Sequence, residues 1–291
     1  MQRPKVIAEI GVCHDGNFDK LLEMTSVAAA ARCSYVKFQT RTPREDVPEH
    51  EFFVERVPPW SKDGKSIPYI EYREKMELTA DQYRDINKHC NKVGIAWTTS
   101  CWGTTAVDFI TSLGIDLPAL KVPSCKLTNH ELLRKMARWA KTSNKELWVS
   151  TGMSTSEEVS EAMSLLKDEM GSLTSTNLVL FNCNSSYPAK TTELNLSLIN
   201  KWREQYDCRI GYSSHSTTLG TSVAAGILGY SHIEVHITYD RSLKYSDHPS
   251  AVGYAGLFKL MSGLKDLEEA WGPGEKVLWD SELPFRKKLR G

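Results

Sequence analysis

Short apolar stretches recur along the chain, separated by longer stretches whose apolar positions have helical spacing. Nearly continuous apolar runs are typical of parallel strands that are covered on both faces. Strands are predicted at residues 6–12, 35–40, 95–100, 119–124, 147–151, 178–182, 209–213 and 232–238. Helices are predicted near residues 20–32, 79–93, 104–113, 129–142, 155–170, 194–202, 219–228 and 256–270.

Eight consecutive strand–helix units predict a closed (β/α)8 TIM barrel in a single domain. Local signals support the helices: Ser154 and Glu157 have capping-box spacing, and Gly94 and Gly114 stand where helices are expected to end. An open, doubly wound sheet is the alternative fold. It is disfavoured because no GxGxxG motif follows an early strand.

Two segments depart from the alternation. Residues 41–72 contain five prolines and many charges, and follow the second strand. An insertion at this place is either a lid or binding loop over a site, or a surface excursion without a role. We therefore expect a catalytic barrel over residues 1–270, with the insertion at 41–72, and a charged tail over residues 271–291.

Composition excludes several classes of function. The chain has 36 basic and 36 acidic side chains, so no overall field would attract nucleic acid or a membrane surface. It contains no apolar run of about 18 residues, the length that would predict a membrane span. Seven cysteines without a CxxC pair argue against a disulfide framework, and the expected location is the cytoplasm.

Polar residues follow or end all eight predicted strands, and in a barrel these ends share one rim. Lys37 and Lys121 lie within strands, where a lysine is rarely buried unless it is paired. Either they reach outward to solvent, or they converge on a phosphate or carboxylate. Neutral hydroxyl donors available around such an anion are Thr99, Ser124, Ser150, Ser185 and Ser213.

Two histidines, His215 and His236, end the neighbouring seventh and eighth strands. Imidazoles in this arrangement can share one divalent ion, so both are candidate metal ligands. Glu234 lies two residues before His236, on the same side of its strand, and is a third ligand or a supporting partner. Cys13 or His14 is a weaker candidate for the same ion.

The order of these residues resembles the catalytic barrel of the sialic acid synthase family, which includes the pseudaminic and legionaminic acid synthases. The resemblance covers about residues 5–270. It is carried by IAEIG at 7–11 with His14, VKFQT at 36–40, KVPS at 121–124, VSTGM at 149–153, SSYP at 185–188, IGYSSHS at 210–216, and IEVH at 233–236 with Asp247.

The resemblance implies a phosphoenolpyruvate-dependent synthase. The phosphoenolpyruvate would be held by Lys37, Thr99, Lys121, Ser124, Ser150, Ser185 and Ser213, and the sugar would face Gln39, Tyr187 and Asp247. His215 and His236 would bind manganese, with magnesium or cobalt as alternatives, and the metal would polarise the sugar aldehyde. Glu9 and Glu234 would position water or support the metal.

The sequence also departs from the family pattern. The family carries Glu or Asp two residues after the serine of its Lys-x-x-Ser motif, whereas this chain has Lys126. Either the acceptor carries a phosphate or carboxylate that meets Lys126, or this side chain turns outward. An asparagine of the family is replaced by Cys13. Family members commonly continue into an antifreeze-like domain, whereas residues 271–291 resemble only the connecting segment. A sugar contact that this domain supplies is therefore either missing or comes from elsewhere, and the insertion at 41–72 is the candidate source.

Three functions remain open from the sequence. The first is condensation of phosphoenolpyruvate with an N-acetylmannosamine-like aldose. The second uses a phosphorylated aldose, as octulosonate phosphate synthases do, and the third is a non-catalytic barrel that binds sugar or phosphate. Lys37, Lys121, His215 and His236 favour the two enzymes over the third. A homodimer is the expected assembly.

Overall fold

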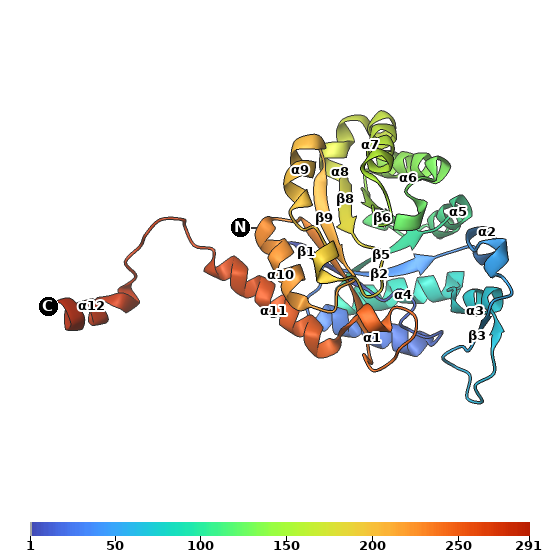
Figure 1. The fold of residues 1–291 in the computed structure, drawn as a ribbon, viewed down its shortest axis with the longest axis horizontal. Coiled ribbons are helices and arrows are strands. Elements are labelled where there is room, and N and C mark those ends of the chain that lie inside the picture. The colour runs from blue at the N-terminus through green and yellow to red at the C-terminus, as the bar shows by residue number, and fades with distance from the viewer. Residues whose placement is uncertain (1) are drawn as a thin grey trace.

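The computed structural model describes residues 2–291, and its centre is a closed barrel of parallel strands (Figure 1). The strands follow one another around the barrel in chain order, and the last pairs with the first, so the expected TIM barrel is confirmed. The barrel strands are β1 (Lys5–Glu9), β2 (Tyr35–Thr40), β5 (Ala96–Cys101), β6 (Ala119–Val122), β7 (Glu146–Ser150), β8 (Leu178–Cys183), β9 (Arg209–Ser214) and β10 (His232–Thr238).

Helices surround the barrel on its outer face (Figure 1). They are α1 (Phe18–Ala30), α4 (Ala80–Val93), α5 (Thr104–Ser112), α6 (His130–Ser143), α7 (Ser156–Met170), α9 (Leu198–Gln205), α10 (Leu219–Leu228) and α11 (Tyr254–Ala270). Shorter elements are α2 (Pro43–Asp46), β3 (Glu55–Arg56), β4 (Ile67–Pro68), α3 (Tyr69–Met76), α8 (Thr174–Asn177), β11 (Val252–Gly253) and α12 (Leu283–Arg290). None of the helices in residues 2–291 combines the length and the apolar character that crossing a membrane requires.

Helix boundaries follow local capping chemistry. Gly94 ends α4 in the left-handed conformation, with φ of 75°, as the sequence predicted. The capping box predicted at Ser154 and Glu157 is wrong by one residue. The N-cap of α7 is Thr155, whose hydroxyl accepts from the backbone N–H of Glu158, while the Glu158 carboxylate accepts from the backbone N–H of Thr155.

The barrel interior has an apolar layer beneath a polar one. Successive side chains of a strand point to opposite faces, so residues two apart share the interior. Interior side chains such as Ile7, Tyr35, Trp148 and Phe181 form a buried cluster separate from the larger core between strands and helices. A Cβ at Gly211 would lie 2.7 Å from the Phe181 ring, so this layer is filled. The next interior positions along the strands therefore form the floor of the cavity above.

The insertion after β2 is made of α2, the β3–β4 hairpin and α3, so it extends beyond residue 72 to the end of α3. Stacking of Trp60 on Tyr72, with ring centroids 5.6 Å apart, joins the hairpin loop to α3. At the other end of the chain, α12 follows an extended segment and lies away from the barrel (Figure 1).

Candidate active site

A cavity of about 200 Å³ opens at the carboxyl ends of the barrel strands. It collects most of the candidate residues, which come from seven of the eight strands or the loops that follow them. The predicted residues that line it are Glu9, Lys37, Gln39, Lys121, Ser124, Ser150, Ser185, Tyr187, Ser213, His215, Glu234 and His236.

Four buried charged side chains form one ion-pair cluster at the cavity floor. Lys37 Nζ lies 2.6 Å from Glu9 Oε2 and 3.7 Å from Glu234 Oε2, and Lys121 Nζ lies 2.7 Å from Glu234 Oε1. Each of the four side chains is at most 4% exposed. The lysines therefore do not reach outward to solvent but converge, with Glu234 between them.

The two carboxyl groups of this cluster have opposite pKa shifts. Burial raises the pKa of Glu9 and outweighs the attraction of Lys37. For Glu234, burial acts in the same upward direction, but Lys121 and Lys37 together lower its pKa to about 2. The two lysines therefore hold Glu234 in its ionised form, whereas burial makes Glu9 the easier of the two carboxylates to protonate.

Hydroxyl groups surround the upper part of this cluster. Ser213 donates to Glu234 Oε1 over 3.1 Å, and Ser124 Oγ accepts from the backbone N–H of Gly152 over 3.1 Å. A Cβ at Gly152 would lie 2.1 Å from Ser185 Oγ, so only glycine leaves space beside Ser124 and Ser185. The group of small donors is therefore packed closely against the backbone that follows β7.

Thr99 does not belong to this group, and its predicted position is wrong. The residue is fully buried, its hydroxyl bonds that of Thr40, and it does not line the cavity. The alternation of a strand explains this, because Thr99 faces the helices while its neighbour Ser100 faces the interior. Ser100 Oγ accepts from Lys37 Nζ over 2.8 Å and occupies the place assigned to Thr99.

The imidazoles of His215 and His236 lie side by side, with ring centroids 5.3 Å apart. The Tyr187 ring stacks on His215 at 4.1 Å and meets His236 edge-on at 5.7 Å. Nδ1 of His215 lies 2.5 Å from the backbone oxygen of Asn184, which assigns the proton to Nδ1 and a lone pair to Nε2. Burial lowers the pKa of His215 to about 3, so its ring is neutral.

Asp247 holds the second imidazole, with Oδ2 of its carboxylate 3.3 Å from Nδ1 of His236. Burial alone would lower the pKa of His236, but the Asp247 carboxylate outweighs burial and raises it. Nδ1 of His236 is nevertheless buried without a well-aligned hydrogen bond. Asp247 does not line the 200 Å³ cavity itself but stands beside it.

These donors fit a divalent ion only in part. Within residues 2–291, no group of three or more His, Cys, Asp or Glu side chains is arranged to hold a metal. The lone pair on Nε2 of the neutral His215 ring, and Nε2 of His236, whose Nδ1 faces Asp247, are the donors that Mn²⁺ or a similar ion accepts. An ion there would take its other ligands from water or substrate. Burial raises the pKa of Cys13 well above its ordinary value, so without a metal the side chain is a neutral thiol.

The residues expected to face the sugar are engaged with protein partners. The amide of Gln39 donates to Glu9 Oε1 over 3.0 Å and accepts from Arg41 over 2.7 Å. Lys126 neither lines the cavity nor turns fully outward, because its Nζ lies 3.6 Å from Oδ1 of Asp46 in the insertion. Lys126 carries a positive charge where the family has a negative one, and the buried Asp46 carboxylate of α2 balances this charge. The sequence did not predict this ion pair.

Comparison with known proteins identifies the family. A sequence profile of the NeuB family matches residues 24–276. The chain belongs to the NeuB family. It is 30% identical to N,N'-diacetyllegionaminic acid synthase of Legionella pneumophila, with 98% of this chain and 78% of the relative covered. Human N-acetylneuraminate-9-phosphate synthase is also 30% identical, with coverage of 98% and 76%.

Solved structures agree with this assignment. An N-acetylneuraminic acid synthetase from Leptospira borgpetersenii, crystallised with citrate, superposes with a TM-score of 0.79 at 25% identity, covering 99% of this chain and 93% of that one. A DAHP synthase of Thermotoga maritima has a TM-score of 0.66 at 16% identity and shares the fold. The predicted family and the predicted class, a synthase-type enzyme, are confirmed.

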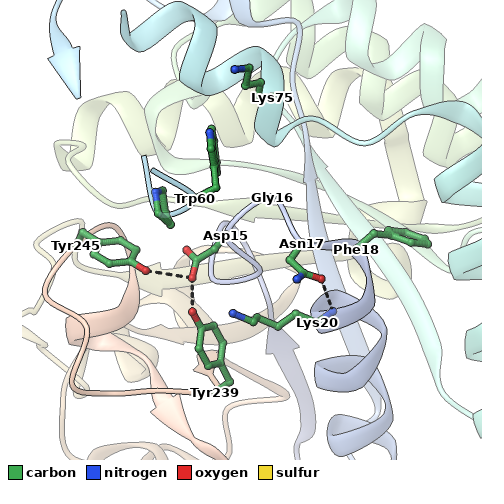
Figure 2. A pocket seen from close by; sticks show the side chains of 10 residues that line it. Asp15, Gly16, Asn17, Phe18, Lys20, Trp60, Lys75, Tyr239 and Tyr245 are labelled. Atoms are coloured by element: carbon green, nitrogen blue, oxygen red, sulfur yellow. Dashed lines mark hydrogen bonds between the residues drawn. The ribbon is translucent and has the colours of Figure 1, made fainter. Parts of the chain in front are cut away.

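Two further cavities of this NeuB-family chain lie beyond Tyr187. One of about 300 Å³ shares Tyr187 with the active-site cavity and also borders Asp247. The next, of about 670 Å³, shares Pro59 and Tyr245 with it. Figure 2 shows this outer cavity, where the Asp15 carboxylate accepts from the hydroxyls of Tyr239 and Tyr245 beneath Trp60. A series of cavities therefore runs outward between the insertion and the loop after β10.

Proposed function

We propose that this chain condenses phosphoenolpyruvate with an aldose to form a sialic-acid-like 3-deoxy-2-ulosonic acid and phosphate. The observation that carries the proposal is the convergence of Lys37, Lys121, His215 and His236 on one cavity in a member of the NeuB family. The relatives of the chain are named as synthases of legionaminic acid and of N-acetylneuraminate 9-phosphate.

In the proposed reaction, the methylene carbon of phosphoenolpyruvate forms a bond to the aldehyde carbon of the sugar. The aldehyde oxygen becomes a hydroxyl group. Water adds to the cationic carbon that bears the phosphate, and the bond between this carbon and the phosphate oxygen breaks. Phosphoenolpyruvate, aldose and water are thus converted to one ulosonic acid and one phosphate.

The ion-pair cluster supports this chemistry through its position and charge. Lys121 and Lys37 would bind the carboxylate and phosphate, while the hydroxyls of Ser124, Ser185 and Ser213 donate without adding charge. Because burial makes Glu9 easier to protonate than Glu234, Glu9 is the group that would exchange a proton with the attacking water. The charged groups of this cluster are already in position before the reaction begins. They therefore stabilise the charge that develops in the transition state without having to reorganise.

A divalent ion, with manganese first and magnesium or cobalt as alternatives, would be held by His215 and His236. When bound, it would polarise the aldehyde oxygen as a Lewis acid. Asp247 would orient His236, and Tyr187 would hold the His215 ring in place by stacking. With only two protein ligands, the ion is expected to exchange readily with a chelator.

The test follows phosphoenolpyruvate consumption and phosphate release with Mn²⁺ and a panel of hexosamines, pentoses and their phosphates. Lys121→Met should abolish consumption. Lys5→Met, a matched change at the opposite end of the barrel, should preserve it. Chelation should stop the reaction and added Mn²⁺ restore it. Folded protein that consumes no phosphoenolpyruvate with any aldose overturns the function, and activity that survives full chelation overturns the metal assignment alone.

A further inference from the structure

The 300 Å³ cavity beside the active site has aromatic walls and two arginines. Its tyrosines come from α3 and from the loops after β8 and β10: Tyr69, Tyr72, Tyr187 and Tyr245. It adjoins the active-site cavity at Tyr187, which lines both cavities and whose ring stacks on His215. A molecule that reacts beside His215 and is longer than the active-site cavity would extend into it.

Arg73 is the buried cation of this cavity. Arg73 is 3% exposed, and one terminal nitrogen of its guanidinium donates to Glu77 Oε1 over 3.0 Å. Its Nε is buried and has no hydrogen-bond partner, although the residue lines the cavity. The terminal nitrogen that Glu77 does not engage is the donor that a ligand in the cavity could meet.

Arg56 is the second cation, supplied by the short strand β3 of the insertion. Its guanidinium lies 4.2 Å from the centroid of the Tyr69 ring, which holds the side chain over the cavity. Across residues 2–291, no carboxylate forms a salt bridge with Arg56 in the structure. Its charge is therefore available to a ligand.

The acids near this cavity already have partners. Glu77 bonds both the Arg73 side chain and the backbone N–H of Arg41. Asp247 directs Oδ2 to His236, at the junction with the active-site cavity. Arg73 is thus neutralised by Glu77, and Arg56 is the cavity's guanidinium without an acidic partner in the described residues. A guanidinium presents a planar donor set that matches the oxygens of phosphate or carboxylate.

We propose that this cavity is the distal acceptor subsite and that it selects aldoses carrying an anionic group, a phosphate or a carboxylate, remote from the aldehyde. The inference rests on the proposed function and specifies its acceptor. Asp247 at the junction accepts from a sugar hydroxyl, the tyrosine rings cover the carbon chain, and Arg56 with Arg73 binds the anion. The insertion thus supplies the sugar contact, through Arg56 rather than Lys126.

The test compares three hexosamine-type acceptors of one configuration: neutral, 6-phosphorylated, and oxidised to the 6-carboxylate. Loss of the phosphoenolpyruvate absorbance gives kcat/KM for each. We expect at least one anionic acceptor to exceed the neutral one by tenfold or more. Arg56→Gln should lower kcat/KM for that acceptor about tenfold through KM, while the neutral acceptor changes less than about twofold.

Arg44→Gln is the matched control, because Arg44 is an exposed arginine of the same insertion that does not line the cavity. It should leave all three acceptors unchanged. The anionic acceptor with the higher kcat/KM shows whether the cavity selects a phosphate or a carboxylate. A neutral acceptor that reacts as well as both anionic ones, or equal effects of Arg56→Gln on all three, overturns the subsite while the synthase function stands. If no acceptor consumes phosphoenolpyruvate, the proposed function itself fails.

Discussion

Glu234→Gln is the change that most directly tests the ion-pair cluster. The substitution keeps the shape of the side chain but removes the charge that Lys121 meets at 2.7 Å and Lys37 at 3.7 Å. Lowering the pKa of Glu234 from 4.5 to about 2 corresponds to about 3 kcal/mol of stability at neutral pH. Breaking a buried ion pair from one side costs about 3–5 kcal/mol, which is the same range.

The sign of the pH dependence follows from the lowered pKa. The contribution of Glu234 is present above the unfolded pKa, near 4.5, and is lost as the pH falls towards the folded value of about 2. The free energy of unfolding of the wild-type protein should therefore exceed that of Glu234→Gln by about 3 kcal/mol at pH 7. The difference should narrow steadily below pH 4.5.

Urea denaturation followed by circular dichroism measures both effects. Adding Lys121→Met to Glu234→Gln removes the uncompensated ammonium and should recover part of the loss, because neither charge is then buried alone. Glu268→Gln breaks the exposed pair with Arg3 and should change nothing measurable. The reasoning is refuted if Glu234→Gln lowers the free energy of unfolding by less than about 1 kcal/mol. It is also refuted if the double variant loses as much stability as the two single variants added together.

Three further predictions concern the rest of the site. Asp247→Asn removes the carboxylate that orients His236, so the apparent Kd for Mn²⁺ should rise about 10–100-fold in a titration; an unchanged Kd contradicts the role. Gly152→Ala places a Cβ 2.1 Å from Ser185 Oγ, so the KM for phosphoenolpyruvate should rise while the midpoint of thermal unfolding changes little. Equal KM values would show that Ser185 moves aside freely. Lys126→Glu sets a carboxylate beside Asp46, so limited proteolysis should cleave the insertion faster; Lys62→Glu, an exposed change in the same insertion, is the control.

The periodic part of the fold could be predicted from the sequence. Strand positions were predictable because buried parallel strands are continuous apolar runs, and closure of the barrel followed from eight repeats of the unit. It was harder to predict which residues of a strand point into the barrel interior. Thr98, Thr99 and Ser100 are all hydroxyl residues, so composition does not show which face is interior, and the choice of Thr99 was wrong.

Side-chain partners from distant segments could not be predicted. Asp46 meets Lys126 only because the insertion folds back over the barrel. Nothing in the local sequence at Lys126 indicates a neutralising acid 80 positions earlier. The metal, the cytoplasmic location and the homodimer stay predictions, since the residues described here test none of them.

Pairing of β1 with β10 has a consequence for how the chain reaches its native state. The register joins Glu9 to His236 in space, although more than two hundred positions separate them in sequence. Glu234, which both buried lysines contact, arrives on the last strand of the cylinder to be synthesised. Until that strand docks, the earlier ammonium groups stay hydrated and the cylinder stays open. Because such long-range pairing must form before the barrel closes, refolding is expected to be slow compared with helical proteins of similar stability.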